Sequence, residues 1–230
     1  MAIYAIGDLH LPGGQDKPMN VFGSLWNDHA AQIAAHWRQL VQPDDLVLIP
    51  GDISWAMHFE QAKPDLLTIA DLPGEKLLLR GNHDYWWSSI GRIREWLPQG
   101  MHALQNDAFR WQDTVICGTR GWVFPTELNP LDEQDEKIFS RELIRLELSL
   151  QQASALNRPL IAMLHYPPLL KDTLSTAFTD LLEQYGVSMC CFGHLHDTGI
   201  QNAFQGVKNH IDYHLVSCDA IGFAPKLLMP

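Results

Sequence analysis

The 230-residue sequence has only four cysteines, and none of them forms a Cys-x-x-Cys pair. Cys117, Cys190 and Cys191 lie in apolar, strand-like runs, so we expect buried reduced thiols rather than a zinc knuckle or disulfides. No apolar run approaches the ~18 residues of a membrane-spanning helix, and the first residues lack the pattern of a signal peptide. These absences predict a soluble, cytoplasmic protein that does not enter a membrane.

Basic residues are also scarce. Lysine and arginine total 16 against 27 aspartates and glutamates, which gives a formal net charge of −11. This charge disfavours non-specific binding to nucleic acid or to an anionic membrane, so neither is expected as a partner. A phosphate-bearing substrate would need a local positive source, which a bound metal ion can supply.

The overall composition is that of an ordinary globular protein, with 46% hydrophobic and 19% charged residues. The length allows one large domain or two small ones, and it is sufficient for a sizeable core. We expect a single domain over residues 1–230.

Short apolar runs alternate with helical patterns in the first part of the chain. Helical spacing is found over residues 24–40, with Ser24 as the expected N-cap, and over residues 59–72 and 86–97. This alternation predicts parallel strands joined by helices. The longest helix is expected over residues 131–153. The apolar runs that read as buried strands cover residues 3–6, 46–49, 77–79, 160–164 and 188–192.

The middle and the end of the chain have a different pattern. Residues 101–104, 109–111 and 114–117 predict short, hairpin-like strands on a second sheet. Residues 211–217 alternate between apolar and polar side chains, and we expect them to close a sheet with the C-terminal tail.

Polar residues follow each of the five buried runs. In an open α/β sheet, ligand sites form at the carboxyl ends of the strands. Residues two apart point to the same side of an extended segment, so Asp8 pairs with His10, and His194 with His196. The polar segments are Asp8-Leu9-His10, Gly51-Asp52, Gly81-Asn82-His83-Asp84, His165-Tyr166-Pro167-Pro168 and Gly193-His194-Leu195-His196.

Each segment also has an ordinary interpretation. Asp52 could serve as the N-cap of the next helix, and residues 81–84 could form a plain polar turn. Taken together, the imidazoles and carboxylates suit Mn, Fe, Zn or Co, and they are too rich in nitrogen for a dedicated Ca or Mg site. The number of donors exceeds what one tetrahedral ion needs.

Two further groups could contact a substrate. Arg120, between two glycines, could bind a phosphate oxygen, although it could also be a solvated surface residue. Several aromatic residues near the strand ends could stack on a base or surround an apolar leaving group, or could instead belong to the core. They are Trp55, Tyr85, Trp86, Trp87, Trp122 and Tyr166.

The ordered motifs resemble the signature of the calcineurin-like metallophosphoesterase superfamily, which is D-x-H, G-D, G-N-H-[DE], H and G-H-x-H. The resemblance extends from Asp8 to His196 and is closest to bacterial predicted phosphohydrolases of unknown substrate, which share residues 16–19 and 118–122. It implies an α/β (α+β) fold, in which a two-sheet β-sandwich is flanked by helices in four αββα layers.

The resemblance also implies a role for each residue of the site. His83 would contact the phosphoryl group and help to protonate the leaving oxygen, and Asp84 would orient His83. Asp52 would bridge two metal ions, with Mn, Fe or Zn expected. One ion would bind Asp8, His10, Asp52 and His196; the other would bind Asp52, Asn82, His165 and His194.

We therefore expect a hydrolase of small phosphate esters, either phosphomonoesters or phosphodiesters. Paired ions lower the pKa of a shared water, so that hydroxide can attack phosphorus in line with the leaving group. One alternative is a protein-interaction scaffold without activity, but scaffolds of this fold are expected to lack some ligands, and here all are present. The other is a metal-dependent nuclease, which the acidic charge and the lack of a basic stripe disfavour.

Overall fold

Two β-sheets organise the chain in the computed structural model, which describes residues 1–14, 19–126 and 130–230. The first sheet belongs to a unit formed by Met1–Ala103 and Val216–Pro230, and the second to a unit formed by Leu104–Leu215. We call these unit 1 and unit 2. Residues 16–18, part of a stretch shared with predicted phosphohydrolases, lie outside the described residues. The single domain expected for residues 1–230 stays a prediction.

The sheet of unit 1 has five strands in the order β11-β1-β2-β3-β4. β1 to β4 are parallel neighbours, and β11 pairs with β1 in the antiparallel direction. All five residues of β2 are buried, as expected for a central parallel strand covered on both faces. The strands are β1 (Ile3–Ala5), β2 (Leu46–Pro50), β3 (Glu75–Leu79), β4 (Met101–Ala103) and β11 (Lys226–Met229).

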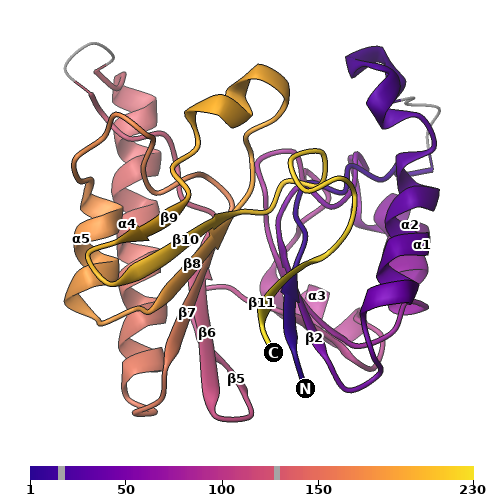
Figure 1. Ribbon diagram of the computed structural model, residues 1–230, viewed down its shortest axis with the longest axis horizontal. Coiled ribbons are helices and arrows are strands. Elements are labelled where there is room, and N and C mark those ends of the chain that lie inside the picture. The colour runs from indigo at the N-terminus through magenta and orange to yellow at the C-terminus, as the bar shows by residue number, and fades with distance from the viewer. Residues whose placement is uncertain (15–18, 127–129) are drawn as a thin grey trace. The chain divides into compact units, whose positions relative to one another are not determined.

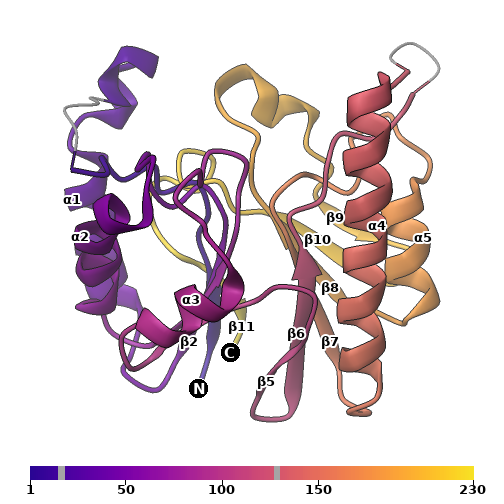
Figure 2. The same ribbon diagram turned by 180° about the vertical axis from the view of Figure 1, so that it is seen from behind.

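Three helices cover one face of this sheet: α1 (His29–Leu40), α2 (Phe59–Ala70) and α3 (Ile90–Trp96) (Figures 1 and 2). Ile33 of α1 and Leu66 of α2 belong to the same buried cluster as the strand residues that face them. The end of α1 is also tied down by polar contacts.

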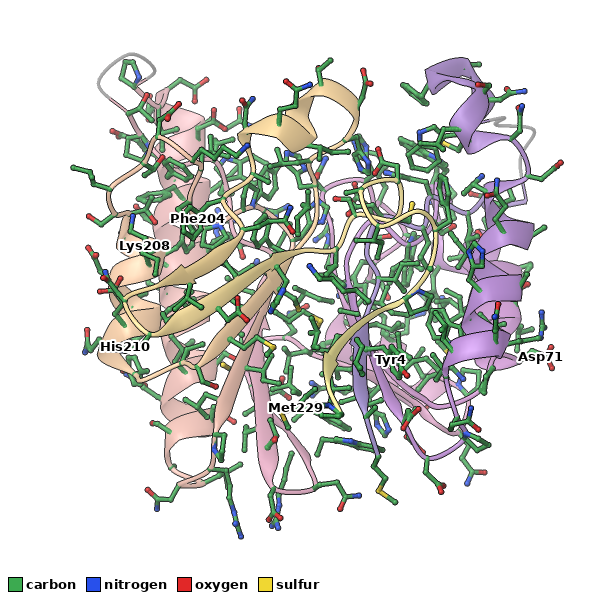
Figure 3. All side chains as sticks on the ribbon, viewed as in Figure 1. Tyr4, Asp71, Phe204, Lys208, His210 and Met229 are labelled. Carbon is green, nitrogen blue, oxygen red and sulfur yellow. The ribbon has the colours of Figure 1, made fainter. Side chains whose placement is uncertain are left out.

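Those contacts involve two of the residues labelled in Figure 3. The Tyr4 hydroxyl donates a hydrogen bond to the Leu40 carbonyl over 3.1 Å, which joins β1 to α1. Asp71, just after α2, accepts from the Arg38 guanidinium at 3.1 Å and so joins α2 to α1. This second contact is exposed and adds little stability.

α1 begins later than predicted. Residues Ser24–Trp26 form a separate 3₁₀ turn (η2), which follows another at Met19–Phe22 (η1). Asn27 is extended and Asp28 is left-handed, with φ 50°, so the helix cannot run through them and starts at His29. The predicted N-cap at Ser24 was therefore wrong.

α3 also begins later, at Ile90 rather than at residue 86. Trp86 and Trp87 are buried in the core of unit 1. The Trp86 indole N–H donates to Asp84 over 2.9 Å, which fixes this segment as an irregular loop. The tertiary contacts of the tryptophans thus override their helical spacing.

The sheet of unit 2 has six strands in the order β5-β6-β7-β8-β10-β9. β6, β7, β8 and β10 are parallel, and the edge strands β5 and β9 are antiparallel to their neighbours. The strands are β5 (Phe109–Trp111), β6 (Thr114–Thr119), β7 (Leu160–Leu164), β8 (Met189–Phe192), β9 (Gly206–Lys208) and β10 (Ile211–Leu215).

Helices α4 (Glu133–Ser154) and α5 (Ala177–Gln184) cover one face of the second sheet (Figures 1 and 2), and a 3₁₀ segment, η3 (Asp197–Asn202), follows β8. Asp132 caps α4 by accepting from the Asp135 backbone N–H over 2.8 Å. At the edge of the sheet, the Lys208 ammonium lies 5.8 Å from the centre of the Phe204 ring (Figure 3). Two mixed sheets flanked by helices confirm the fold class that the sequence predicts.

Two strand pairings differ from the prediction. β10 pairs with β8 and β9, whereas the C-terminal strand β11 pairs with β1 in the other sheet. The expected pairing of residues 211–217 with the tail was therefore wrong, because strand alternation carries no information about distant partners. β5 and β6 form the expected hairpin, but β4 extends the first sheet.

All four cysteines are buried free thiols, which confirms the expectation of reduced cysteine. Burial raises the pKa of the Cys117 thiol to about 12, so it is protonated and unreactive at neutral pH. None of the helices in the described part of the chain combines the length and the apolar composition needed to cross a membrane.

Candidate metal centre

The loops after β1 and β2 carry three buried residues of the predicted site. Asp8, His10 and Asp52 have exposed fractions of 0%, 4% and 2%. The loops lie side by side, because the Asp8 N–H donates to the Gly51 carbonyl and the His10 N–H to the Asp52 carbonyl, both over 2.9 Å. His10 Nε2 lies 3.8 Å from Asp52 Oδ2. The structure thus brings these three donors together at the carboxyl end of the sheet, as predicted.

The backbone achieves this in an unexpected way. Asp8, His10 and Asp52 are all left-handed, with φ values of 59°, 44° and 52°. The prediction placed Asp8 and His10 on one side of an extended segment, and that reasoning was wrong although the two residues do lie together. A left-handed non-glycine residue costs about 1–2 kcal/mol, and such strain is concentrated at functional sites.

The loop after β3 packs tightly against Asp52. The His83 backbone N–H donates to Asp52 Oδ1 over 2.8 Å. A Cβ atom on Gly81 would lie 2.1 Å from the same oxygen, so only glycine fits at this position. The glycine before Asn82 and His83 therefore allows their loop to approach the Asp52 carboxylate directly.

Asp84 is fully buried and connects the loops through its carboxylate. Oδ1 accepts from the backbone N–H groups of Ile53 and Ser54 and from the Trp86 indole, and Oδ2 accepts from the Gly81 N–H over 2.8 Å. Burial, with a smaller contribution from the charge of Asp52, raises the pKa of Asp84 to about 6. The backbone hydrogen bonds that the carboxylate accepts lower the pKa and only partly offset this rise. In the described part of the chain, the His83 imidazole is not one of these donors to Asp84. The role of Asp84 in orienting the His83 ring therefore stays a prediction.

The aromatic residues of this region divide into two groups. Trp86 and Trp87 are 1% and 5% exposed and belong to the core. Trp55 is half-buried and stacks on His10, with ring centres 4.7 Å apart and ring planes inclined by 20°. Tyr85 is 53% exposed. Only the second group is accessible to a ligand.

Asp65 was not predicted as part of the site. It lies in α2 and is 7% exposed, and its Oδ2 accepts from the Gly13 backbone N–H over 2.8 Å and from the Ser54 hydroxyl over 2.5 Å. Gly13 and Ser54 follow closely after His10 and Asp52 in their loops. An acidic residue on the apolar face of a helix, beside Ala62 and Leu66, is the sequence signal that indicates such a buried role.

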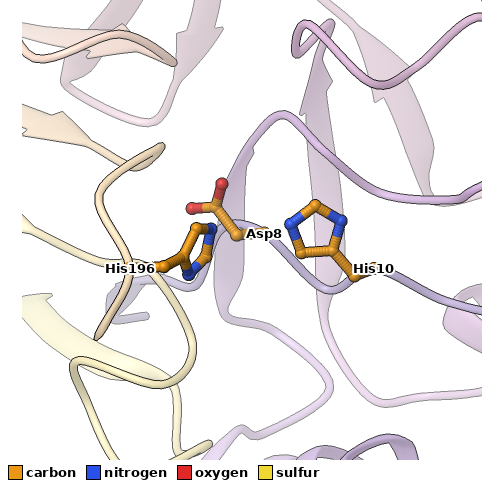
Figure 4. A group of neighbouring side chains, drawn as sticks. All are labelled: Asp8, His10 and His196. Carbon is orange, nitrogen blue, oxygen red and sulfur yellow. The ribbon is translucent and has the colours of Figure 1, made fainter. Parts of the chain in front are cut away.

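Unit 2 carries the remaining histidines of the predicted site. His165 follows β7 and is fully buried, and its ring centre lies 5.1 Å from that of His194, which follows β8. The Tyr166 ring packs on His194, with centres 4.0 Å apart. Figure 4 labels His196 on the loop after β8, together with Asp8 and His10 on the loop after β1 of unit 1.

Arg120 has contacts within unit 2 that include Glu142 and Trp122. Its guanidinium pairs with the buried Glu142 carboxylate at 3.4 Å and lies 4.5 Å from the centre of the Trp122 ring. The side chain is 17% exposed, so the alternative of a freely solvated surface arginine does not hold. Its backbone carbonyl accepts from the N–H groups of His165 and Tyr166, which ties it to the predicted ligand loop. A contact between Arg120 and a phosphate stays a prediction.

The donor chemistry fits a metal centre. The described residues include groups of aspartates and histidines that could hold a metal ion. In unit 1, buried carboxylates and an imidazole are held by strained backbone and by the close approach of Gly81. Mixed oxygen and nitrogen donors of this kind suit first-row transition metals.

The two-sheet fold and the Asp/His donors are those of a metal-binding α/β protein, and the family match gives the class: a metal-dependent phosphoesterase. The sequence matches the model of the calcineurin-like phosphoesterases over residues 1–198. The chain therefore belongs to the calcineurin-like phosphoesterase family, whose members bind two metal ions. A search among curated proteins finds no match.

Solved structures with the same fold have little sequence in common with this chain. The protein of unknown function AQ665 from Aquifex aeolicus is 16% identical, with a TM-score of 0.53, over 98% of this chain and 95% of its own. The phosphopantetheinyl hydrolase PptH from Mycobacterium tuberculosis is 12% identical, with a TM-score of 0.55, over 100% and 96%. GAP50, the anchor in the inner membrane complex of Plasmodium, is 10% identical, with a TM-score of 0.53, over 96% and 72%. At these identities the likeness supports the fold alone.

Proposed function

We propose that this protein is a cytoplasmic hydrolase of small phosphate monoesters or diesters that works with two metal ions. The observation that carries the proposal is the buried set of Asp8, His10 and Asp52, held by left-handed backbone. The ions would be Mn, Fe or Zn, held by the residues that the family signature assigns. When bound, they supply the positive charge that an acidic protein needs to attract a phosphate, and they activate water.

Positioning of the site and protonation of the leaving group would be carried out by residues of the chain. Asp52 uses Oδ1 to accept the His83 backbone N–H, and its Oδ2 lies toward His10. His83 would donate a proton from its imidazole to the leaving oxygen as the bond to phosphorus breaks. Asp84 accepts backbone hydrogen bonds from the loops that carry Asp52 and His83, and it thereby holds these two loops next to each other. The proposed substrate is a small phosphate ester rather than a nucleic acid, since a net charge of −11 disfavours binding to a polyanion.

The first test is hydrolysis of p-nitrophenyl phosphate and bis-p-nitrophenyl phosphate after metal removal and separate reloading with Mn, Fe, Co, Ni, Zn and Mg. We expect turnover only with metal, and the ratio of the two rates distinguishes phosphatase from phosphodiesterase. Clear metal binding without turnover of either ester would refute the proposal for aryl esters and favour a non-enzymatic scaffold.

Two substitutions test the assigned roles. Asp52→Asn should lose bound metal and activity together, and near-normal turnover would exclude a bridging carboxylate. His83→Ala should keep its metal content and lose about 10²- to 10⁴-fold in kcat, the usual contribution of a general acid. The matched control is His58→Ala, since His58 is exposed and its side chain forms no cap hydrogen bond to α2. Loss of metal in His83→Ala would assign His83 as a ligand instead.

A further inference from the structure

Two accessible aromatic residues flank His83 in unit 1. The Trp55 ring centre lies 4.7 Å from that of His83, with ring planes inclined by 52°. The Tyr85 ring centre lies 6.1 Å from that of His83, and the two rings are close to perpendicular, at 80°. We call Trp55 and Tyr85 the aromatic rim. His83 itself is half-buried beside it.

Trp55 is fixed in place before any ligand binds. The Trp55 ring stacks on the His10 ring, and the Trp55 indole N–H donates a hydrogen bond to Met19 Sδ over 3.1 Å. The Tyr85 backbone N–H donates to the His83 carbonyl over 2.8 Å, and its ring, whose edge-on contact is with His83, is 53% exposed. The aromatic rim therefore combines Trp55, whose ring is already held in place, with Tyr85, whose ring is accessible. Because the Trp55 ring does not have to be ordered on binding, the entropy cost of binding a flat group is lower.

The chemistry of the rim is apolar. Trp55 and Tyr85 carry no formal charge, and the Trp55 indole N–H already donates to Met19 Sδ, so the two residues present mainly ring surface. A sugar or another polyhydroxylated group needs several hydrogen-bond partners, whereas these side chains mainly offer ring faces and hydrocarbon surface. A planar aromatic group would gain the most from such a surface.

The position of the rim shows which part of a substrate it would meet. If His83 protonates the leaving oxygen, the atoms attached to that oxygen lie next to the side chains packed around His83. We infer that the substrate is a phosphate ester whose leaving group carries an aromatic ring, which packs against Trp55 and Tyr85. This inference rests on the proposed function, since it requires His83 to face the leaving group.

Phosphonates test the inference without turnover, because their carbon–phosphorus bond is not hydrolysed. The dissociation constants of phenylphosphonate and methylphosphonate are measured by calorimetry on the full-length, metal-loaded protein. We expect phenylphosphonate to bind about tenfold more tightly, as a ring contact of this kind provides. Tyr85→Ser should reduce this ratio to about twofold and leave methylphosphonate binding unchanged, and Tyr85→Phe should keep the ratio.

Leu174→Ser is the matched control, because Leu174 is an apolar residue of unit 2 that is 89% exposed. It should leave both dissociation constants unchanged.

The outcomes separate the inference from the function on which it rests. Equal binding of phenyl- and methylphosphonate in an enzyme that hydrolyses p-nitrophenyl esters would overturn the aromatic leaving group and leave the proposed function intact. An unchanged ratio in Tyr85→Ser would equally overturn it. Absence of metal-dependent hydrolysis would remove the proposed function and, with it, the inference.

Discussion

Replacing Asp65 tests how the two ligand loops of unit 1 are held. Its carboxylate accepts from the Gly13 N–H and the Ser54 hydroxyl, in the loops that carry His10 and Asp52. Asp65→Ala leaves both donors buried without this acceptor, at about 1.5–3 kcal/mol each for hydrogen bonds to a charged group. Part of this loss is offset because a buried carboxylate is no longer desolvated. We expect the free energy of unfolding to fall by about 2–4 kcal/mol.

Asp65→Asn separates the acceptor from the charge. One amide oxygen can accept from both donors, so the loss should be within about 1 kcal/mol. Burial raises the pKa of Asp65, opposed by the hydrogen bonds from Ser54 and Gly13. The folded state therefore holds the proton more tightly than the unfolded state. The stability that this provides is fully present below the ordinary value of 3.8 and is lost as the pH rises through the folded pKa. Asp65→Asn should remove that dependence.

The assay is urea unfolding of metal-free protein, followed by tryptophan fluorescence at pH 7 and at lower pH. Metal affinity, measured by competition with a chelator, should also fall about tenfold in Asp65→Ala, as for other groups that support metal ligands. Asp180→Ala is the control, since Asp180 is an exposed aspartate in the first turn of α5. Equal stability of Asp65→Ala and Asp65→Asn would refute the reasoning.

Two further substitutions test supporting contacts. Lys76 of β3 is 3% exposed and its ammonium donates to backbone carbonyls at the end of α2, so Lys76→Met should lower the free energy of unfolding by about 1–3 kcal/mol in urea. A variant as stable as the wild type would contradict this. Tyr166→Leu removes the ring that packs on His194 and should weaken metal binding about tenfold in the chelator assay. An unchanged affinity would show that the ring does not position His194.

The strands were predictable because their burial is continuous. β2 is buried along its full length, so its apolar residues form an unbroken run in the sequence. The ends of such runs could then be located to within a few residues, and Asp8, Asp52, His83 and His165 were found next to them. This local pattern accounts for most of the candidate site.

What the sequence did not predict depends on contacts between distant residues. The start of α1 is set by a left-handed Asp28, and residue spacing carries no signal for it. The left-handed geometry of His10 was missed for the same reason. Asp65 was missed because its partners lie 52 and 11 residues away, at Gly13 and Ser54, so no short motif contains them.

The pairing of β11 with β1 makes unit 1 discontinuous along the chain, with unit 2 as an insertion between its two segments. During synthesis, β1 can pair with β2 on one side as soon as β2 is made. Its other side stays unpaired until residues 226–229, which form β11, have been synthesised. Over that interval it is an open edge with unpaired backbone groups, which is the kind of surface that recruits strands from other molecules. Removing only those four residues would restore that edge in the finished protein, three residues before Asp8. The last strand therefore protects the segment that leads directly into the candidate metal centre.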